Sequence, residues 1–268
     1  MQSHDDPNHR RKLWLLAAII LVTVVVALLV PPLPQDPEYH SFADQRTLFG
    51  IANFWNVISN LPFIPVGIAG LFLLSGPSIP GGLASQRAGY GVFFLGAILI
   101  GLGSGYYHLE PTNYSLVWDR LPMTLAFMAF VAVIVGENID ETAGRRALLP
   151  LMALGLLSVA YWYYTELQGR GDLRLYALVQ FLPMLLLPLT LWLFRSPFIS
   201  NLWVWLAMLC YGASKIAEAT DLLVYEALGI SGHSIKHVLA ALGVLAFCMA
   251  LHRRRPVSHI VPAVRPGV

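Results

Sequence analysis

The sequence predicts an all-α protein, namely a polytopic transmembrane helical bundle with a seven-helix core and one extra N-terminal helix. Hydrophobic residues make up 57% of the 268 residues and charged residues only 12%, whereas soluble domains average about 25% charged residues. The mean hydropathy is +0.64, and a soluble core of this size cannot bury that much apolar surface. Apolar segments of membrane-spanning length recur along the chain, with turn-forming Gly and Pro residues between them.

Charge and cysteine usage exclude several other classes of protein. The formal net charge is only +2 and the basic residues form no stripe, which argues against disorder and against nucleic-acid binding. Cys210 and Cys248 lie in apolar runs, so neither a disulfide framework nor a Cys-based metal site is expected. Strand-like segments of alternating hydrophobicity are absent, and no feature specifies an oligomeric state.

The chain divides into basic tails at residues 1–12 and 253–268, an extra transmembrane helix within 13–34, and a seven-helix core at 35–252. Helices of about 20 residues cross a bilayer core. Eight apolar segments are expected to do so: Leu13–Val30, Ile51–Leu74, Tyr90–His108, Val117–Val135, Ala147–Tyr164, Leu175–Phe194, Asn201–Tyr225 and Ile235–Leu251.

The first apolar segment has two interpretations, a signal peptide or a retained helix. It follows the basic residues Arg10, Arg11 and Lys12, as a signal peptide would. However, it is longer than a usual signal-peptide core, and it ends at Pro31-Pro32 without a small-residue cleavage pattern. The sequence therefore favours a retained helix.

The distribution of basic residues predicts that both termini face the cytoplasm, because Lys and Arg accumulate on that side. This orientation leaves only four arginines outside: Arg46, Arg120, Arg170 and Arg174. It puts eleven basic residues inside: Arg10, Arg11, Lys12, Arg87, Arg145, Arg146, Arg195, Arg253, Arg254, Arg255 and Arg265.

Five polar residues are expected to meet at one membrane depth, towards the outer leaflet. His233 and His237 are four residues apart and share a helix face. His108 ends the third segment, with Ser104 one turn before it, and Asp119 opens the fourth segment. Three imidazoles around one point, with a fourth position free, are typical of a catalytic zinc site. Ionisable groups inside a membrane are costly and are functional candidates by default.

These residues carry a family resemblance. Ser104-Gly105-Tyr106-Tyr107-His108, then Asp119, then His233-Ser234-Ile235-Lys236-His237 resemble the motifs of the alkaline ceramidase family, within a superfamily of seven-helix zinc-dependent membrane hydrolases. The run Ile51–Asn60 also resembles the start of that family's first core helix. The resemblance covers about residues 38 to 252.

The resemblance implies a zinc-dependent hydrolase of linear amide bonds. His108, His233 and His237 would hold Zn²⁺, Asp119 would act as general base and then return a proton to the leaving amine, and Ser104 would orient the water or stabilise the oxyanion. A site at this depth is most easily reached by a membrane lipid. The expected substrate is an N-acyl lipid such as ceramide, cleaved to a fatty acid and a sphingoid base.

One departure from the family argues against a calcium site. Eukaryotic alkaline ceramidases have an acidic cluster before the first core helix, whereas this chain offers Glu38 and Asp44 beside a basic Arg46, with a neutral Asn53. Calcium needs six to eight oxygen ligands, and carboxylates give most of the affinity.

Further polar residues are candidates for substrate binding, each with an alternative role. Three asparagines share one helix face and can line a headgroup pocket or hydrogen-bond between helices. Two aromatic residues can instead belong to an interfacial belt, and four charged residues can form an ion-pair network. These candidates are Asn53, Asn56, Asn60, Tyr107, Trp118, Glu218, Asp221 and Lys236, with Lys215 as a further member of the network.

Three other functions compete with the hydrolase. A metal or proton transporter usually shows inverted repeats and broken helices, and the sequence has no internal repeat. A receptor-like lipid-binding member of the same superfamily would not need Asp119 and Ser104. An intramembrane serine protease would need a His from another helix beside Ser104, and His108 does not fit that pattern.

Overall fold

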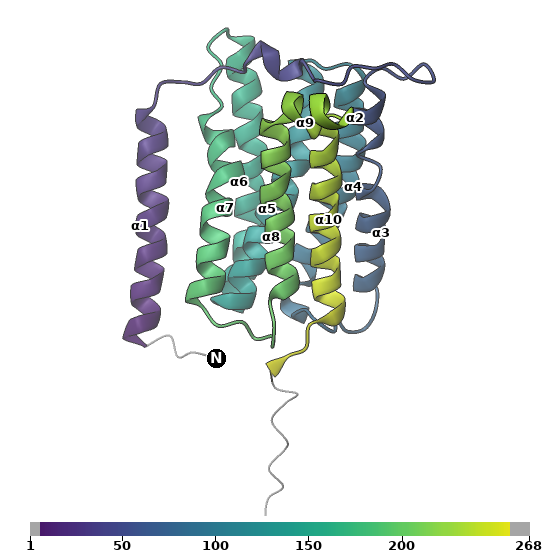
Figure 1. The fold of residues 1–268 in the computed structure, drawn as a ribbon. Helices are drawn as coiled ribbons and strands as arrows, with labels where there is room; N and C mark the ends of the chain where they lie inside the picture. Colours follow the sequence, from purple (N-terminus) through teal and green to yellow (C-terminus); the bar gives the residue numbers. More distant parts are fainter. Residues whose placement is uncertain (1–5, 258–268) are drawn as a thin grey trace, which may run out of the picture.

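The computed structural model describes residues 6–257 and is all-α over that range, which confirms the predicted fold class. Parts of the predicted tails, including Arg265, lie outside the described residues. The helices are α1 (Pro7–Leu29), α2 (Phe54–Ile58), α3 (Phe63–Leu74), α4 (Arg87–Leu109), α5 (Asn113–Asn138), α6 (Glu141–Leu167), α7 (Arg174–Leu193), α8 (Leu202–Ala219), α9 (Asp221–Leu228) and α10 (Gly232–Arg253) (Figure 1).

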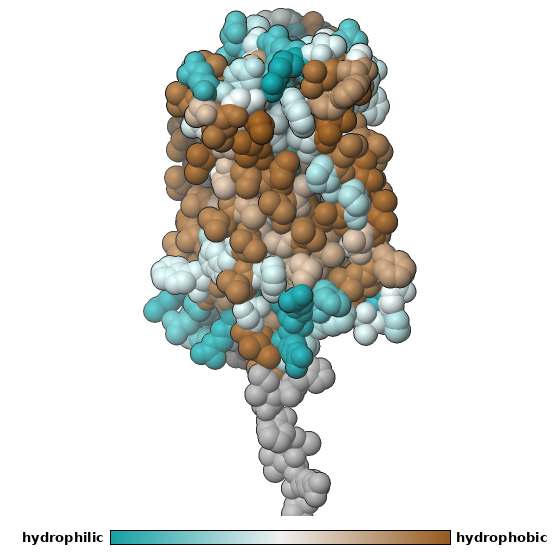
Figure 2. Space-filling model, turned by 45° about the vertical axis from the view of Figure 1, so that its right-hand side comes forward, coloured by the Kyte–Doolittle hydropathy of each residue, from teal (hydrophilic) through white to brown (hydrophobic). Residues whose placement is uncertain are grey.

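The surface of the bundle is that of a multi-pass membrane protein. A broad apolar belt covers its middle, and hydrophilic residues gather at both ends (Figure 2). Among the described residues, seven spans are long and apolar enough to cross a membrane: α1, α2 with α3, α4, α5, α6, α7 and α10. The expected sixth core span, α8, is 18 residues long but less apolar, because Lys215 and Glu218 lie near its end.

Two of the expected continuous segments are broken. The segment 51–74 divides into α2 and α3, because Pro62 has no N–H to donate to the Ile58 carbonyl. The segment 201–225 divides into α8 and α9 at Thr220, and α9 ends at Gly229 in the left-handed conformation. Both breaks lie towards the same end of the bundle (Figure 1).

Helix α1 lies beside the bundle next to α7 (Figure 1). It begins at Pro7, earlier than the expected Leu13, because the Asp6 side chain caps it by accepting from the Asn8 N–H. Only 6% of the apolar stretch of α1 is buried against the rest of the protein. The Arg174 guanidinium donates to the carbonyls of Leu28 and Val30, at 3.1 and 2.7 Å, and so fixes the end of α1.

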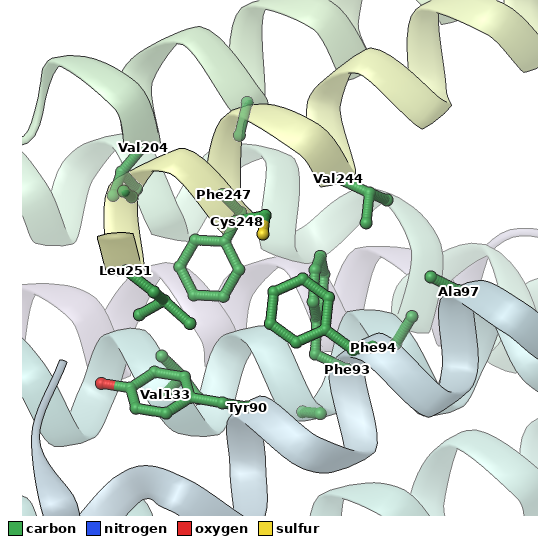
Figure 3. Packing of buried hydrophobic residues seen from close by; sticks show 14 of the residues in the cluster. Tyr90, Phe93, Phe94, Ala97, Val133, Val204, Val244, Phe247, Cys248 and Leu251 are labelled. Carbon is green, nitrogen blue, oxygen red and sulfur yellow. The ribbon is translucent and has the colours of Figure 1, made fainter. Parts of the chain in front are cut away.

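Aromatic packing holds α4, α5 and α10 together in the half of the bundle nearer the described termini. Phe247 of α10 lies against Tyr90, Phe93 and Phe94 of α4, with ring centroids 6.1, 5.0 and 6.1 Å away (Figure 3). Phe130 of α5 contacts the same ring at 4.9 Å. This packing joins the last turns of α10 to the first turns of α4.

The start of α1 and the end of α10 lie at one end of the bundle (Figure 1). That end contains a buried ion pair, in which Arg254 donates to both carboxylate oxygens of Glu137 at 2.7 and 2.8 Å. Tyr90 donates to the same carboxylate at 2.6 Å. The opposite end carries the end of α4 and the starts of α5 and α10, where the sequence places its candidate site.

Candidate metal centre and catalytic site

Three histidines converge at the end opposite the described termini. His108 comes from the last turn of α4, and His233 and His237 come from the first turns of α10. All three are buried, and one ligand nitrogen from each lies within 4.8 Å of the others. The Nε2 atoms of His108 and His237 are 3.2 Å apart. The helix ends therefore bring together the imidazoles that the sequence singles out.

This cluster fits a metal ion. Two nitrogens about 2.0–2.1 Å from one tetrahedral ion lie about 3.3 Å apart, close to the 3.2 Å between His108 and His237. Nε2 of His233 is buried and has no hydrogen-bond partner among the described residues. An unsatisfied buried nitrogen is costly, and coordination would satisfy it.

Polar residues in α2 and in the turn directly after it contact α10 and hold His237 in place. Ser59 Oγ lies 2.8 Å and Asn60 Nδ2 lies 3.3 Å from Nδ1 of His237. Ser234 of α10 donates to Asn56 Oδ1 at 2.7 Å. Hydrogen bonds at the far nitrogen fix the orientation of a ligating imidazole. The asparagines thus form the interhelical hydrogen bonds that the sequence allows, and Ser59 is a contributor that the sequence analysis does not identify.

A loop before α2 covers the histidines. The Phe42 ring lies 4.7 Å from the His108 ring and 4.6 Å from the His233 ring, between centroids. Asp221 holds this loop, because its Oδ2 accepts from the Ala43 N–H at 3.0 Å. Its Oδ1 also accepts from the His233 N–H at 2.9 Å. Asp221 therefore positions both the cover and the start of α10, and no periodic pattern in the sequence marks Phe42.

The carboxylate next to this loop is already paired. Arg46 donates to both oxygens of Asp44, at 2.9 and 2.5 Å, and this guanidinium holds the pKa of the Asp44 carboxyl below its usual range. Asn53, in the left-handed conformation, donates to the His108 carbonyl at 2.9 Å. Asp44, Arg46 and Asn53 are thus engaged with each other or with the end of α4.

Asp119 and Ser104 face each other across α5 and α4. Both are buried, and the Ser104 hydroxyl lies beside the Asp119 carboxylate. They line a cavity of about 500 Å³ together with His237. The cavity continues between α5, α7, α8 and α10 and is mostly lined by apolar side chains. A carboxylate, a hydroxyl and one histidine of the cluster therefore share one lipid-sized space.

A glycine allows α4 and α5 to approach at this point. A Cβ added at Gly103 would lie 2.1 Å from the Trp118 carbonyl oxygen, so only glycine fits there. Since Ser104 follows Gly103 and Asp119 follows Trp118, the same close approach brings the two polar side chains together. Gly103 therefore serves the packing of α4 against α5.

We expect Gly103→Ala to destabilise the protein by about 1–3 kcal/mol, as overpacking against backbone typically does. The measurement is the thermal unfolding midpoint of the purified protein in detergent. Gly105→Ala is the matched control, because a Cβ there meets no atom within 4 Å and alanine favours a helix. Equal midpoints for the two variants would contradict the packing role of Gly103.

The other substrate-binding candidates take different places. Tyr107 points away from the cavity, and its hydroxyl lies 2.9 Å from Nδ1 of His40. Trp118 is 48% exposed on the outside of α5. Lys236 lines the cavity. Contact with a substrate stays a prediction for each of these residues, and for Asn53, Asn56, Asn60, Glu218 and Asp221.

The predicted ion-pair network is present, with one member fewer. Glu218 accepts from Lys215 at 2.7 Å and from Lys236 at 2.5 Å, which links α8 to α10. Asp221 is not part of it, because Asp221 lies beyond the break at Thr220 and binds the start of α10 instead.

Comparison with known proteins identifies the family. No curated protein matches the chain. The sequence model of the Ceramidase family matches residues 46–199, which is more than half of the chain. The match includes Ser104, His108 and Asp119 and ends before His233 and His237. The chain therefore belongs to the Ceramidase family.

Proposed function

We propose that this protein is an intramembrane, zinc-dependent amide hydrolase that cleaves an N-acyl lipid such as ceramide into a fatty acid and a sphingoid base. The family implies a hydrolase that acts on an amide bond of a membrane lipid. The observation that carries the proposal is the cavity shared by Asp119, Ser104 and His237, beside a buried three-histidine cluster. A receptor that only binds lipid would not need a buried carboxylate at that point.

Three imidazoles form a nitrogen ligand set that suits zinc, with a fourth position for water. Zinc bound by His108, His233 and His237 would supply Lewis-acid polarisation and a water that ionises near neutral pH. Asp119 accepts the proton of the attacking water and returns it to the nitrogen of the leaving amine. Asp119 is buried, so bulk water does not reach its carboxylate and cannot exchange protons with it.

Ser104 has a supporting role in this mechanism. Its hydroxyl lies beside Asp119, and both side chains line the cavity, so Ser104 can orient the carboxylate there. The same hydroxyl can donate to the oxygen that gains charge as the amide is attacked. Ser104 has no hydrogen-bonded histidine among the described residues, so it lacks the activating base that a serine nucleophile needs.

The cavity suits a lipid that enters from the membrane. Leu209 and Ile216 of α8 line it and are also 69% and 68% exposed on the outer surface of the bundle. On the opposite side of the cavity, Pro183 and Pro188 of α7 line it and interrupt the hydrogen bonding of that helix. An acyl chain can therefore lie between α7 and α8 while the amide reaches Asp119.

Purified protein assayed for zinc and for fatty-acid release from a panel of N-acyl lipids tests the proposal. We expect about one zinc per chain and release from at least one lipid of the panel. Zinc without hydrolysis of any lipid would favour the receptor-like or transporter alternative. Hydrolysis that survives complete removal of metal would contradict zinc dependence.

We also propose that both termini, with the basic segments 1–12 and 253–268, face the cytoplasm and that the metal centre faces the outer leaflet. The support is the excess of eleven basic residues over four. A C-terminal reporter should read as cytoplasmic, and a tag inserted at Gly169, in the turn after α6, should be accessible from outside. The opposite pattern would place the metal centre in the inner leaflet.

A further inference from the structure

Two lysines from different helices share one carboxylate beside the cavity. Lys215 of α8 donates to Oε2 of Glu218 at 2.7 Å, and Lys236 of α10 donates to Oε1 at 2.5 Å. All three side chains are largely buried, with 21%, 15% and 19% of their surfaces exposed for Lys215, Lys236 and Glu218. Both oxygens of Glu218 are therefore occupied.

The charges in this group do not balance. Two ammonium groups face one carboxylate, and each ammonium has three N–H donors but forms a single hydrogen bond within residues 6–257. Asp119 is the acidic residue that lines the cavity, and neither lysine is ion-paired with it. The Lys215 ammonium also lies 6.0 and 5.8 Å from the centroids of the Phe181 and Tyr211 rings. An ammonium group whose hydrogen bonds are incomplete inside a membrane protein is a candidate functional group.

The unbalanced charge is presented to the cavity. Lys215 and Lys236 both line it, together with Asp119, Ser104 and His237, whereas Glu218 does not. A molecule in the cavity can therefore contact Lys215 and Lys236 but not the carboxylate of Glu218. The rest of the lining is mostly apolar, so a charge-assisted hydrogen bond formed there is stronger than one in water.

We propose that Lys215 and Lys236 form an anion subsite that binds the carboxylate of an amphiphilic lipid. The carboxylate has two possible sources, the fatty acid released by hydrolysis or an acidic headgroup on the N-acyl lipid itself. The subsite deepens the proposed function, on which it rests for the identity of these lipids. Glu218 positions the two ammonium groups.

The test is direct binding of four probes to purified protein in neutral-lipid nanodiscs, before and after treatment with a chelator. The probes are palmitic acid, its uncharged analogue hexadecanol, and N-palmitoylglycine with N-palmitoylethanolamine as its uncharged pair. Wild type should bind the acids more tightly than the uncharged analogues. Lys215→Met should weaken acid binding about tenfold, as the loss of a hydrogen bond to a charged group does. This variant leaves Glu218 paired with Lys236. Lys236→Met should have the same effect and leaves Glu218 paired with Lys215.

Glu218→Gln separates an anion subsite from a purely structural ion pair. It removes the carboxylate that pairs with both lysines and should tighten acid binding by about three- to tenfold, the worth of about one charge–charge contact near a protein surface. If it weakens acid binding instead, or if acids and uncharged analogues bind wild type equally, the proposal is wrong. Lysine dependence for palmitic acid identifies the product as the source, and lysine dependence for N-palmitoylglycine identifies the headgroup.

Palmitic acid and hexadecanol have no amide bond to cleave, and the two amide probes are compared after chelation, so the two proposals can fail separately. A protein that hydrolyses no amide but binds acids in a lysine-dependent way keeps the subsite and refutes the hydrolase. A protein that hydrolyses N-acyl lipids while its lysine variants bind acids like wild type keeps the hydrolase and refutes the subsite. Persistence of the lysine effect after chelation shows that the carboxylate is not bound through a metal.

Discussion

Asp119→Asn should lower amide hydrolysis by about 10²–10⁴-fold, the usual contribution of a positioned acid–base group. Asparagine has the shape of aspartate and can still pair with Ser104, but it cannot accept and return a proton. Metal content and lipid binding should therefore stay at the wild-type level. The assay measures fatty-acid release and zinc on the same preparation, so that loss of metal is not mistaken for loss of the base.

Two controls sharpen this result. Asp172→Asn changes another buried carboxylate, one that pairs with Arg174 away from the cavity, and should leave hydrolysis far less affected. Ser104→Ala should cost less than Asp119→Asn, because the general base remains. If Asp119→Asn and wild type hydrolyse the same lipid equally fast, the role assigned to Asp119 is wrong.

Replacing any of the three histidines should abolish stable metal binding and, with it, hydrolysis. A site with two imidazoles leaves the ion under-coordinated, since zinc sites in enzymes use three protein ligands. His108→Ala, His233→Ala and His237→Ala should each contain far less than one zinc per chain after dialysis, as measured by mass spectrometry of the metal.

His40→Ala is the matched control for these variants. His40 lies at the same end of the bundle, but its ring nitrogens contact Tyr107 and Asn113 at 2.9 and 3.0 Å. This variant should retain its zinc. Full zinc occupancy in all three of the other variants would exclude the proposed ligand set.

Helix periodicity and membrane depth explain how much of the site could be predicted from the sequence. The four-residue spacing of His233 and His237 places them on one face of α10. An even alternation of helix direction then brings the end of α4 and the starts of α5 and α10 to one level. These two rules suffice to predict the convergence of His108 with the α10 pair and the placement of Asp119 beside Ser104.

The features that were not predicted depend on contacts between segments far apart in the chain. Phe42 lies in an irregular loop and reaches the histidines only because Asp221 holds its neighbour. Pro62 is visible in the sequence as a helix breaker, but the segment is apolar on both sides of it, so hydropathy alone predicts one continuous helix. The sequence predicts the ion-pair network around Glu218, but the absence of Asp221 from it depends on the break at Thr220 and on the contact of Asp221 with the start of α10.

The separation of the three histidines along the chain has a consequence for assembly. His108 ends a helix in the first half of the protein, while His233 and His237 belong to the last membrane span. During synthesis the centre cannot exist until that last span has inserted and docked. In a bilayer, apolar surfaces give helices little reason to associate, so an ion that binds only the docked arrangement would favour it by mass action. Metal supply would then govern the maturation of this protein as well as its chemistry.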